Sequence, residues 1–207
     1  ASDIKQLKTH KIDAVFSPSN NTLYTGALCD QTQVSPRAIA HRLCGTSRPN
    51  FFEGVSTIVL KLLLCCQPDH IVFGQKDYQQ TCVIQQMIKD FCIPCQLHTI
   101  PTVRAHNGLA LSSRNQYLSD TAQSVAPQLY TTLCAMAEAF KHGIAPDTLL
   151  KSGAQRLVQA GFKLDYLEIC DPKTLKPIEV PASCAIILCA AWLNTTRLID
   201  NILCARR

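Results

Sequence analysis

HIVFGQKDYQQTCVIQQMIKDFCIPCQLHTIP, residues 70–101, is the stretch that decides the fold of this chain. Residues 70–74 form a short β-branched and aromatic run that ends in glycine, which is typical of a buried strand. Residues 77–91 then show a helical period, and residues 95–101 return to a strand pattern. Strand, helix and strand at such short spacing predict a βαβ unit and a parallel sheet.

The sequence before this unit predicts three helices and one strand. Residues 2–11 have the pattern of a short amphipathic helix, and residues 12–19 that of a short strand running into a turn. Residues 36–44 begin with proline and are followed by glycine, which predicts a second short helix. Residues 54–68 are apolar almost all round and end in proline, so we expect a third helix that is buried on every side.

After Pro101 the rhythm changes, and the sequence predicts a second lobe. A long helix is expected over residues 120–142, with Ser119 as its N-cap, and another over residues 146–160. Three strand-like runs follow with no helix between them, which favours an antiparallel sheet: residues 164–171, 184–193 and 196–203. We place the hinge between the two lobes at residues 101–105.

Composition and charge limit the class of protein. With 47% hydrophobic residues in a chain of 207, there is enough apolar material for a packed core, which excludes a disordered tail. The longest apolar run, residues 185–193, is far shorter than the ~20 residues needed to cross a bilayer. A net charge of +5 spread along the chain is too weak to indicate nucleic-acid binding. Because residues 1–11 lack an apolar core, we expect no secretory signal and a cytoplasmic location.

Cysteine is unusually frequent, with twelve in the chain. Most lie inside apolar stretches such as residues 59–66 and 184–193, where a thiol packs as a small hydrophobe. The Cys-x-x-Cys pair of Cys92 and Cys95 has no second pair at zinc-ribbon spacing, and it leads into a strand instead of opening a helix. We therefore expect buried, reduced thiols; a metal site and a redox pair are the alternatives.

A first polar segment, residues 73–80, follows the strand that begins at residue 70. In open α/β sheets ligands bind at the carboxyl ends of the strands, and Gly74 would let a backbone approach a ligand closely. Lys76 adds a positive charge beside the N-terminus of the next helix, which already favours an anion. Asp77 could cap that helix or accept hydrogen bonds from a ribose. The alternative is a capped helix with an exposed lysine.

A second polar segment, residues 108–115, lies directly after the hinge. Ser112 and Ser113 can each donate a hydrogen bond to a polyphosphate, and Arg114 can bind two oxygens at once. The alternative is an ordinary turn stabilised by a serine hydroxyl before a helix. Neither segment is a Walker A motif, and the sequence contains no GxGxxG, GxSxG or HExxH.

Five segments in this order and spacing resemble the pantothenate synthetase (pantoate–β-alanine ligase) family: SRPNFFEGVSTIVLKLL (47–63), FGQKDYQQ (73–80), TVRAHNGLALSSRNQYL (102–118), LDYLEICDPKTL (164–175) and AAWLNTTRLIDN (190–201). The resemblance implies an α/β fold: an incomplete Rossmann-like, parallel-sheet nucleotide-binding lobe over residues 1–102. A smaller α+β lid lobe with antiparallel strands covers residues 103–207. It also implies a homodimer, with no nucleic acid or membrane as partner.

The activity implied is the ATP- and Mg²⁺-dependent ligation of pantoate and β-alanine to pantothenate, a step of coenzyme A biosynthesis. The reaction passes through a pantoyl-adenylate and releases AMP and pyrophosphate. Carried over residue by residue, the ATP-binding residues are Gly74, Gln75, Lys76, Asp77, Val103, Leu111, Ser112, Ser113 and Arg114. Of these, Lys76, Ser112, Ser113 and Arg114 are the catalytic candidates, and Gln80 matches a residue that binds pantoate. The metal ligands stay unassigned.

The chain also departs from the family pattern. The family's His-x-Gly-His signature, whose second histidine is taken as the catalytic acid, precedes every segment matched here. We therefore expect the parallel-sheet lobe to lack about two βα units, roughly 60–70 residues, and turnover by these 207 residues alone to be weak or absent. Gln75 and Cys44 stand where the family has or often has Glu, and Phe51 where it commonly has His. The alternatives are a non-catalytic, nucleotide-binding remnant of the family and another nucleotidyl transferase.

Overall fold

The computed structural model describes residues 2–24, 26, 31–179 and 182–205. The chain divides into two compact units, residues 1–33 and residues 34–207. The first unit contains two short helices, α1 (Ser2–Thr9) and α2 (Asn20–Leu23). Ser19 caps α2, because its side-chain oxygen accepts a hydrogen bond from the backbone N–H of Thr22 at 3.2 Å.

The prediction of a strand over residues 12–19 is wrong. In the structure this segment has no regular secondary structure, and Ile12, Val15 and Phe16 expose 49%, 49% and 54% of their surface. A β-branched and aromatic run forms a strand only where its backbone N–H and C=O groups find a partner strand. None of the strands in the described part of the chain pairs with it.

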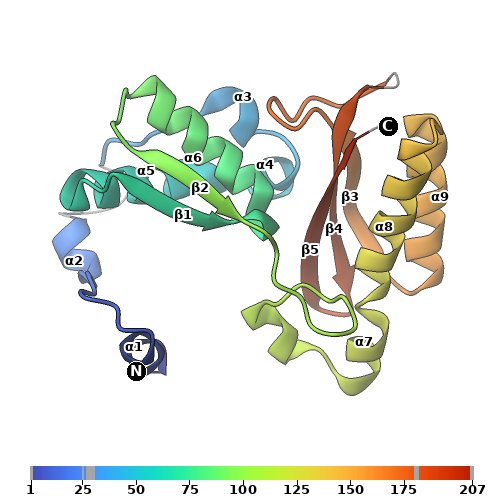
Figure 1. The fold of residues 1–207 in the computed structure, drawn as a ribbon, viewed down its shortest axis with the longest axis horizontal. Helices are drawn as coiled ribbons and strands as arrows, with labels where there is room; N and C mark the ends of the chain where they lie inside the picture. The colour runs from blue at the N-terminus through green and yellow to red at the C-terminus, as the bar shows by residue number, and fades with distance from the viewer. Residues whose placement is uncertain (1, 25, 27–30, 180–181, 206–207) are drawn as a thin grey trace. The chain divides into compact units, whose positions relative to one another are not determined.

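The second unit begins with a parallel pair of strands and the helices around it. In chain order its elements are α3 (Arg37–Ala40), α4 (Cys44–Ser47), α5 (Phe51–Cys66), β1 (His70–Gly74), η2 (Gln75–Asp77), α6 (Tyr78–Asp90) and β2 (Gln96–Ile100). β1 pairs in parallel with β2, in a register that runs from His70 opposite Gln96 to Gly74 opposite Ile100. The predicted βαβ unit is therefore confirmed, with α6 as its crossover helix (Figure 1).

Burial in this half is less complete than the sequence predicts. β1 alternates between exposed and half-buried residues, so it is not fully buried, and Val72 exposes 63% of its surface. α5 buries one side only: Phe52 and Leu63 are inside, while Leu64 is 60% exposed. The helix expected over residues 36–44 is replaced by two separate turns of helix, α3 and α4.

The remaining elements form an antiparallel sheet covered by two helices. In chain order they are η3 (Ser113–Tyr117), α7 (Asp120–Val125), α8 (Gln128–Lys141), α9 (Pro146–Gln159), β3 (Lys163–Cys170), β4 (Cys184–Leu193) and β5 (Thr196–Ala205). The sheet order β3-β4-β5 confirms the predicted antiparallel arrangement. Ser119 caps α7 as expected, but the single helix predicted over residues 120–142 is two helices. They meet at Pro127, which has no N–H to continue the ladder.

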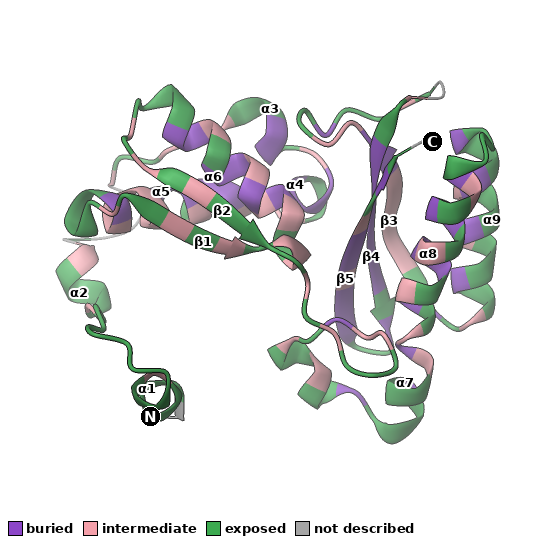
Figure 2. Cartoon of the chain, viewed as in Figure 1, coloured by how far each residue is buried: buried purple, intermediate pink, exposed green. Residues whose placement is uncertain are grey.

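Both faces of the antiparallel sheet are buried, as the purple middle of β4 shows (Figure 2). On one face Ile187 and Cys189 belong to a core built with α8 and α9. On the other face Ile186 and Leu188 belong to a second core, shared with α3, α5 and α6. A strand buried on both sides reads as a continuous apolar run, which explains residues 185–191. The second core joins this sheet to the half that contains β1 and β2.

The cysteines that the structure describes are free thiols, but they are not uniformly buried. Four are buried and four are exposed: Cys44, Cys170, Cys189 and Cys204 inside, and Cys65, Cys66, Cys92 and Cys184 outside. The expectation of a buried Cys65–Cys66 pair is wrong because the last turn of α5 faces solvent. Among the described residues, no helix is both long enough and apolar enough to cross a bilayer.

Candidate active site

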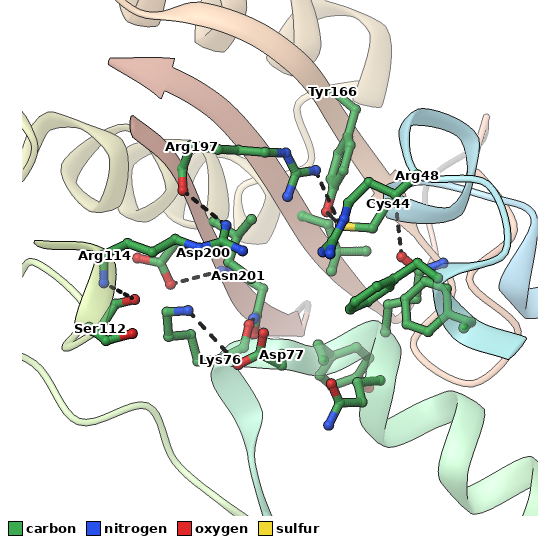
Figure 3. A pocket seen from close by; sticks show the side chains of 18 residues that line it. Cys44, Arg48, Lys76, Asp77, Ser112, Arg114, Tyr166, Arg197, Asp200 and Asn201 are labelled. Atoms are coloured by element: carbon green, nitrogen blue, oxygen red, sulfur yellow. Dashed lines mark hydrogen bonds and ion pairs between the residues drawn. The ribbon is translucent and has the colours of Figure 1, made fainter. Parts of the chain in front are cut away.

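A cavity of about 280 Å³ lies where the carboxyl end of β1 meets β5 (Figure 3). Three groups of residues line it. The turn between β1 and α6, with the first turn of α6, contributes Lys76–Gln80, and the N-cap and first residues of η3 contribute Ser112–Arg114. The third group comes from α4, α5 and the antiparallel sheet: Cys44, Arg48, Phe51, Phe52, Tyr166, Leu188, Arg197, Ile199, Asp200 and Asn201. Both polar segments predicted from the sequence therefore face one cavity.

The β1–α6 turn presents its lysine to the cavity. The Lys76 side chain is 20% exposed, and its Nζ lies 3.8 Å from Asp77 Oδ2. Asp77 makes no side-chain hydrogen bond at the start of α6, so the alternative role of a capping aspartate is not what the structure shows. The first N–H groups of α6 thus keep their preference for an anion.

Ser112 and Arg114 form the side of the cavity opposite the β1–α6 turn. Ser112 Oγ accepts a hydrogen bond from the Arg114 backbone N–H at 3.2 Å, which is the serine-stabilised turn that the sequence left open as an alternative. Arg114 Nη1 donates to the carbonyl oxygen of Arg197 at 3.3 Å. Lys76, Ser112 and Arg114 also line a small adjoining space of about 10 Å³, which places the two turns next to each other.

Positive charge dominates the cavity. Arg48, Lys76, Arg114 and Arg197 line it, against the carboxylates of Asp77 and Asp200. Burial lowers the pKa of Arg48, and the nearby charges of Arg114 and Arg197 lower it further. Cations that repel one another in a partly buried space are relieved by an anion, so the arrangement favours a polyanionic ligand.

Arg197 is held in place by two partners. Its Nε and Nη2 donate to Asp165 Oδ2 at 2.9 and 2.6 Å, and Nη2 also donates to Cys44 Sγ at 3.3 Å. Although burial lowers the pKa of Arg197, these hydrogen bonds raise it above the ordinary value. The Tyr166 hydroxyl lies 3.1 Å from the same sulfur, and burial raises the pKa of that phenol, so it stays neutral.

Gln79 and the phenylalanines shape the other end of the cavity. Gln79 is buried and donates to the carbonyl oxygens of Ile39 and Arg42 at 2.8 and 2.7 Å, which fixes the loop before α4. The Arg48 guanidinium stacks 3.5 Å from the centre of the Phe51 ring. Phe51 and Phe52 thus give this end an apolar wall, and Gln80 adds a polar group to it.

The structure brings together six of the ten residues singled out from the sequence. Lys76, Asp77, Gln80, Ser112, Ser113 and Arg114 line the cavity. The other four lie outside its lining: Gly74, Gln75, Val103 and Leu111. A Cβ at Gly74 would meet no atom within 4 Å. Val103 and Leu111 expose 64% and 53% of their surface and are joined by a backbone hydrogen bond of 2.9 Å.

Sequence reasoning missed the residues that the antiparallel sheet contributes. Arg197, Asp200 and Asn201 are 7%, 4% and 3% exposed on an otherwise apolar strand. Polar residues in a predicted buried strand were a usable signal, because such groups are buried only when they are paired. A neighbouring cavity of about 550 Å³ shares Arg48, Arg114 and Arg197 and adds Trp192 and Tyr117.

Comparisons with known proteins show the family to which the chain belongs. A family model described as pantoate-beta-alanine ligase matches residues 1–203. A pantothenate synthetase of Chromohalobacter salexigens is 46% identical over 200 residues, which cover 97% of this chain and 71% of the relative. One from Pseudomonas savastanoi pv. phaseolicola is 45% identical over 203 residues, covering 98% and 72%.

Solved structures give the same result. A crystal structure of pantothenate synthetase from Thermus thermophilus matches with a TM-score of 0.91 and 36% identity, covering 97% of this chain and 73% of that one. A pantoate-beta-alanine ligase from Francisella tularensis, complexed with beta-gamma ATP and beta-alanine, matches with a TM-score of 0.78 and 32% identity. That alignment covers 98% of this chain and 69% of that one.

Proposed function

Because the chain belongs to the pantoate–β-alanine ligase family, it is an ATP-dependent ligase, and we propose that the cavity described above is where ATP and pantoate react. The observation that carries this proposal is the cluster of cations at the carboxyl end of β1, with Lys76 on one turn and Arg114 on the other. The reaction joins pantoate to β-alanine through a pantoyl-adenylate.

The chemistry needs no nucleophile from the protein. A carboxylate oxygen of pantoate attacks the α-phosphorus of ATP, the bond to the β-phosphate oxygen breaks, and pyrophosphate leaves. The amine of β-alanine then attacks the acyl carbon, loses a proton and displaces AMP. The work left to the protein is to position the reactants, neutralise the developing charge and keep water from the adenylate.

The catalytic residues we propose are Lys76, Ser112, Ser113 and Arg114. Lys76 and Arg114 would neutralise charge on the α-phosphate and on the departing pyrophosphate. Hydroxyl groups on the Ser112–Ser113 turn would donate hydrogen bonds to phosphate oxygens. The proximity of the two turns supports this assignment, because a triphosphate has to contact both at once.

The nucleoside part of ATP would extend out of the cavity. Asp77, whose carboxylate is half exposed and free of a capping role, would accept hydrogen bonds from the ribose. The backbone at Gly74 and Gln75 would border the sugar, and the exposed Val103 and Leu111 would border the adenine. These four residues lie outside the cavity lining, which suits contacts with the outer half of an elongated ligand.

Pantoate would bind at the apolar end. Its two methyl groups suit a wall made by Phe51 and Phe52, and its hydroxyls suit the amide of Gln80. In this pose the carboxylate of pantoate points toward the cations at the other end.

Mg²⁺ is proposed to arrive on the triphosphate. Mg²⁺ at nucleotide sites is bound by substrate phosphates, water and one or two carboxylates. Within residues 2–24, 26, 31–179 and 182–205, no three His, Cys, Asp or Glu side chains gather into a metal site. The ion would neutralise phosphate charge alongside Lys76 and Arg114.

We also propose a cytoplasmic homodimer that supplies pantothenate for coenzyme A synthesis. The free thiols of the described cysteines fit a reducing compartment. Val72 and Ile100, on one face of the parallel pair, expose 63% and 48% of their surface and could lie in a contact between copies. Light scattering on the purified chain is expected to give twice its mass of 22.8 kDa.

The assay that tests the function measures three products. The turnover of these 207 residues alone is expected to be weak, but the AMP, pyrophosphate and pantothenate that the chain forms from Mg-ATP, pantoate and β-alanine should appear in equal amounts. Omitting pantoate should abolish pyrophosphate release, because its carboxylate is the nucleophile. Pyrophosphate release without pantoate, or calorimetry that detects no ATP binding, would contradict the proposal.

A further inference from the structure

Two adjacent residues of β5 hold the two turns that border the cavity. Asp200 and Asn201 are 4% and 3% exposed, although β5 is an edge strand of its sheet. Consecutive residues of a strand point to opposite faces. Asp200 lies opposite Cys189, on the face packed against α8 and α9, and Asn201 lies opposite Leu188, on the face shared with α6.

Asn201 binds the β1–α6 turn through its backbone. Its Nδ2 donates to the carbonyl oxygens of Gln75 and Lys76 at 2.9 and 3.0 Å, and its Oδ1 accepts from Gln75 Nε2 at 3.4 Å. These two carbonyls are the backbone carbonyls of Lys76 itself and of the residue before it. The side-chain amide thus sets the position from which Lys76 reaches into the cavity (Figure 3).

Asp200 binds the other turn through Arg104. The Asp200 carboxylate accepts two hydrogen bonds from the guanidinium, at 2.6 and 2.9 Å, and the same guanidinium stacks 3.5 Å from the centre of the Tyr130 ring. Arg104 also donates to the carbonyl oxygen of Gly108 at 3.1 Å, which closes the loop that leads to Ser112. Arg104 thereby anchors the turn that carries Ser112–Arg114.

The polar character of this pair calls for an explanation other than stability. Buried charge pairs contribute little net stability, and an apolar pair of similar volume often serves a core as well or better. An apolar pair could not bind backbone carbonyls of one turn and an arginine of the other. The directional hydrogen bonds of this pair therefore serve to position the two turns more than to stabilise the core.

We propose that Asp200 and Asn201 are positioning residues that set the separation between the two phosphate-binding turns, a role that rests on the proposed function of Lys76 and Arg114. A triphosphate must contact both turns at once, and an error of about 1 Å in such a geometry can cost a hundredfold in rate. Neither side chain needs to touch the ligand. Asn201 acts through Lys76, and Asp200 acts through Arg104 and the following turn.

The test is a double-mutant cycle on nucleotide affinity, measured by calorimetry with the full chain. Asn201→Leu, which keeps the volume and adds no charge, should weaken ATP binding about tenfold and AMP binding by less than about threefold, because AMP lacks the phosphates that the turns share. In a Lys76→Ala background, Asn201→Leu should have almost no further effect on ATP affinity, because the two residues act as a unit.

Controls separate positioning from a general loss of stability. Cys204→Ala perturbs the buried core of the same strand without reaching the cavity, and it should leave the affinity for ATP unchanged. Asn201→Ser, which keeps one hydrogen-bonding group, serves if Asn201→Leu does not fold, and it should give a smaller loss of the same kind. Equal losses for ATP and AMP, or additive effects of Lys76→Ala and Asn201→Leu, would overturn the proposal.

The failure of the proposed site is distinguishable from the failure of this inference. If Lys76→Ala binds ATP as tightly as the unmodified chain, the site assignment itself is wrong. If Lys76→Ala weakens ATP binding and Asn201→Leu does not, the site stands and the positioning role falls.

Discussion

The two sheets of residues 34–207 differ in how completely they are buried. In the antiparallel sheet, residues 185–191 of β4 are at most 4% exposed and have packed cores on both sides. In the parallel pair, every second residue of β1 is exposed (Figure 2). Lys76 follows β1, yet the side chain that holds its turn comes from β5. The better-packed sheet therefore holds the turn of the site in position, whereas the less-packed sheet contributes the lysine.

The largest expected effect comes from removing that lysine. Lys76→Ala should lower kcat/KM for pantothenate formation by about a hundredfold or more, the range typical of losing one group that stabilises transition-state charge. The matched control is Lys89→Ala, which removes the same charge from the exposed surface of α6. Steady-state kinetics on both variants checks this. Similar losses of kcat/KM in the two variants would show that the effect comes from removing a positive charge at any position.

A pair of core substitutions tests the difference in burial directly. Ile187→Ala empties space in the sheet buried on both sides and should reduce the free energy of unfolding by about 3 kcal/mol. Val72→Ala on the exposed face of β1 should change it by less than about 0.5 kcal/mol at a protein concentration low enough to keep the chain monomeric. Urea unfolding followed by circular dichroism measures both values. Comparable losses would mean that the exposed face of β1 is covered in solution.

Arg104→Lys probes the second anchored turn with a smaller effect. Lysine keeps the charge beside Asp200 but cannot make two parallel hydrogen bonds to the carboxylate or stack flat on Tyr130. We expect ATP affinity to fall by about fivefold with little change in melting temperature. Arg156→Lys, on the exposed side of α9, is the matched control. Unchanged ATP affinity in Arg104→Lys would separate this loop from the site.

The smallest effect concerns alkaline pH. Burial raises the pKa of the Cys204 thiol from 9.0 to about 11. Between these values the unfolded chain loses the proton that the folded chain keeps, so stability falls as pH rises from about 9 to 11, by at most about 1.4 kcal/mol per pH unit from this group. Cys204→Ala should flatten the slope of unfolding free energy against pH in that window. An unchanged slope would mean that the pH dependence of stability comes from other groups, such as Cys82, whose pKa burial also raises to about 11.

Local patterns predicted much of the fold. The βαβ unit over residues 70–101, the N-cap at Ser119 and the three antiparallel strands are confirmed, because each depends on a short periodic pattern or a single side chain. One error occurred where a distant partner decides, because residues 12–19 lack a partner strand. Another had a local cause, because Pro127 interrupts the helix predicted over residues 120–142.

Part of the candidate site followed from the sequence as well. Lys76 and the Ser112–Arg114 turn stood out because charged and hydroxyl groups follow a strand or a hinge, where ligands bind. The structure brings the two segments to the same cavity. The role of Arg197 and Asn201 was not predictable, because their partners lie far along the chain, at Asp165 and at Gln75–Lys76.

The sequence by itself determined which residues carry charge, where strands and helices begin, and to which family the chain belongs, since all of these are encoded within short or ordered segments. The tertiary structure alone decided the spacing between Lys76 and Arg114 and the means of holding it. That spacing depends on the pairing of β5 with β4, the strand that packs between two cores, and on β5 pointing Asp200 and Asn201 to opposite sides. No local pattern records it, because it arises from hydrogen bonds between segments about a hundred residues apart.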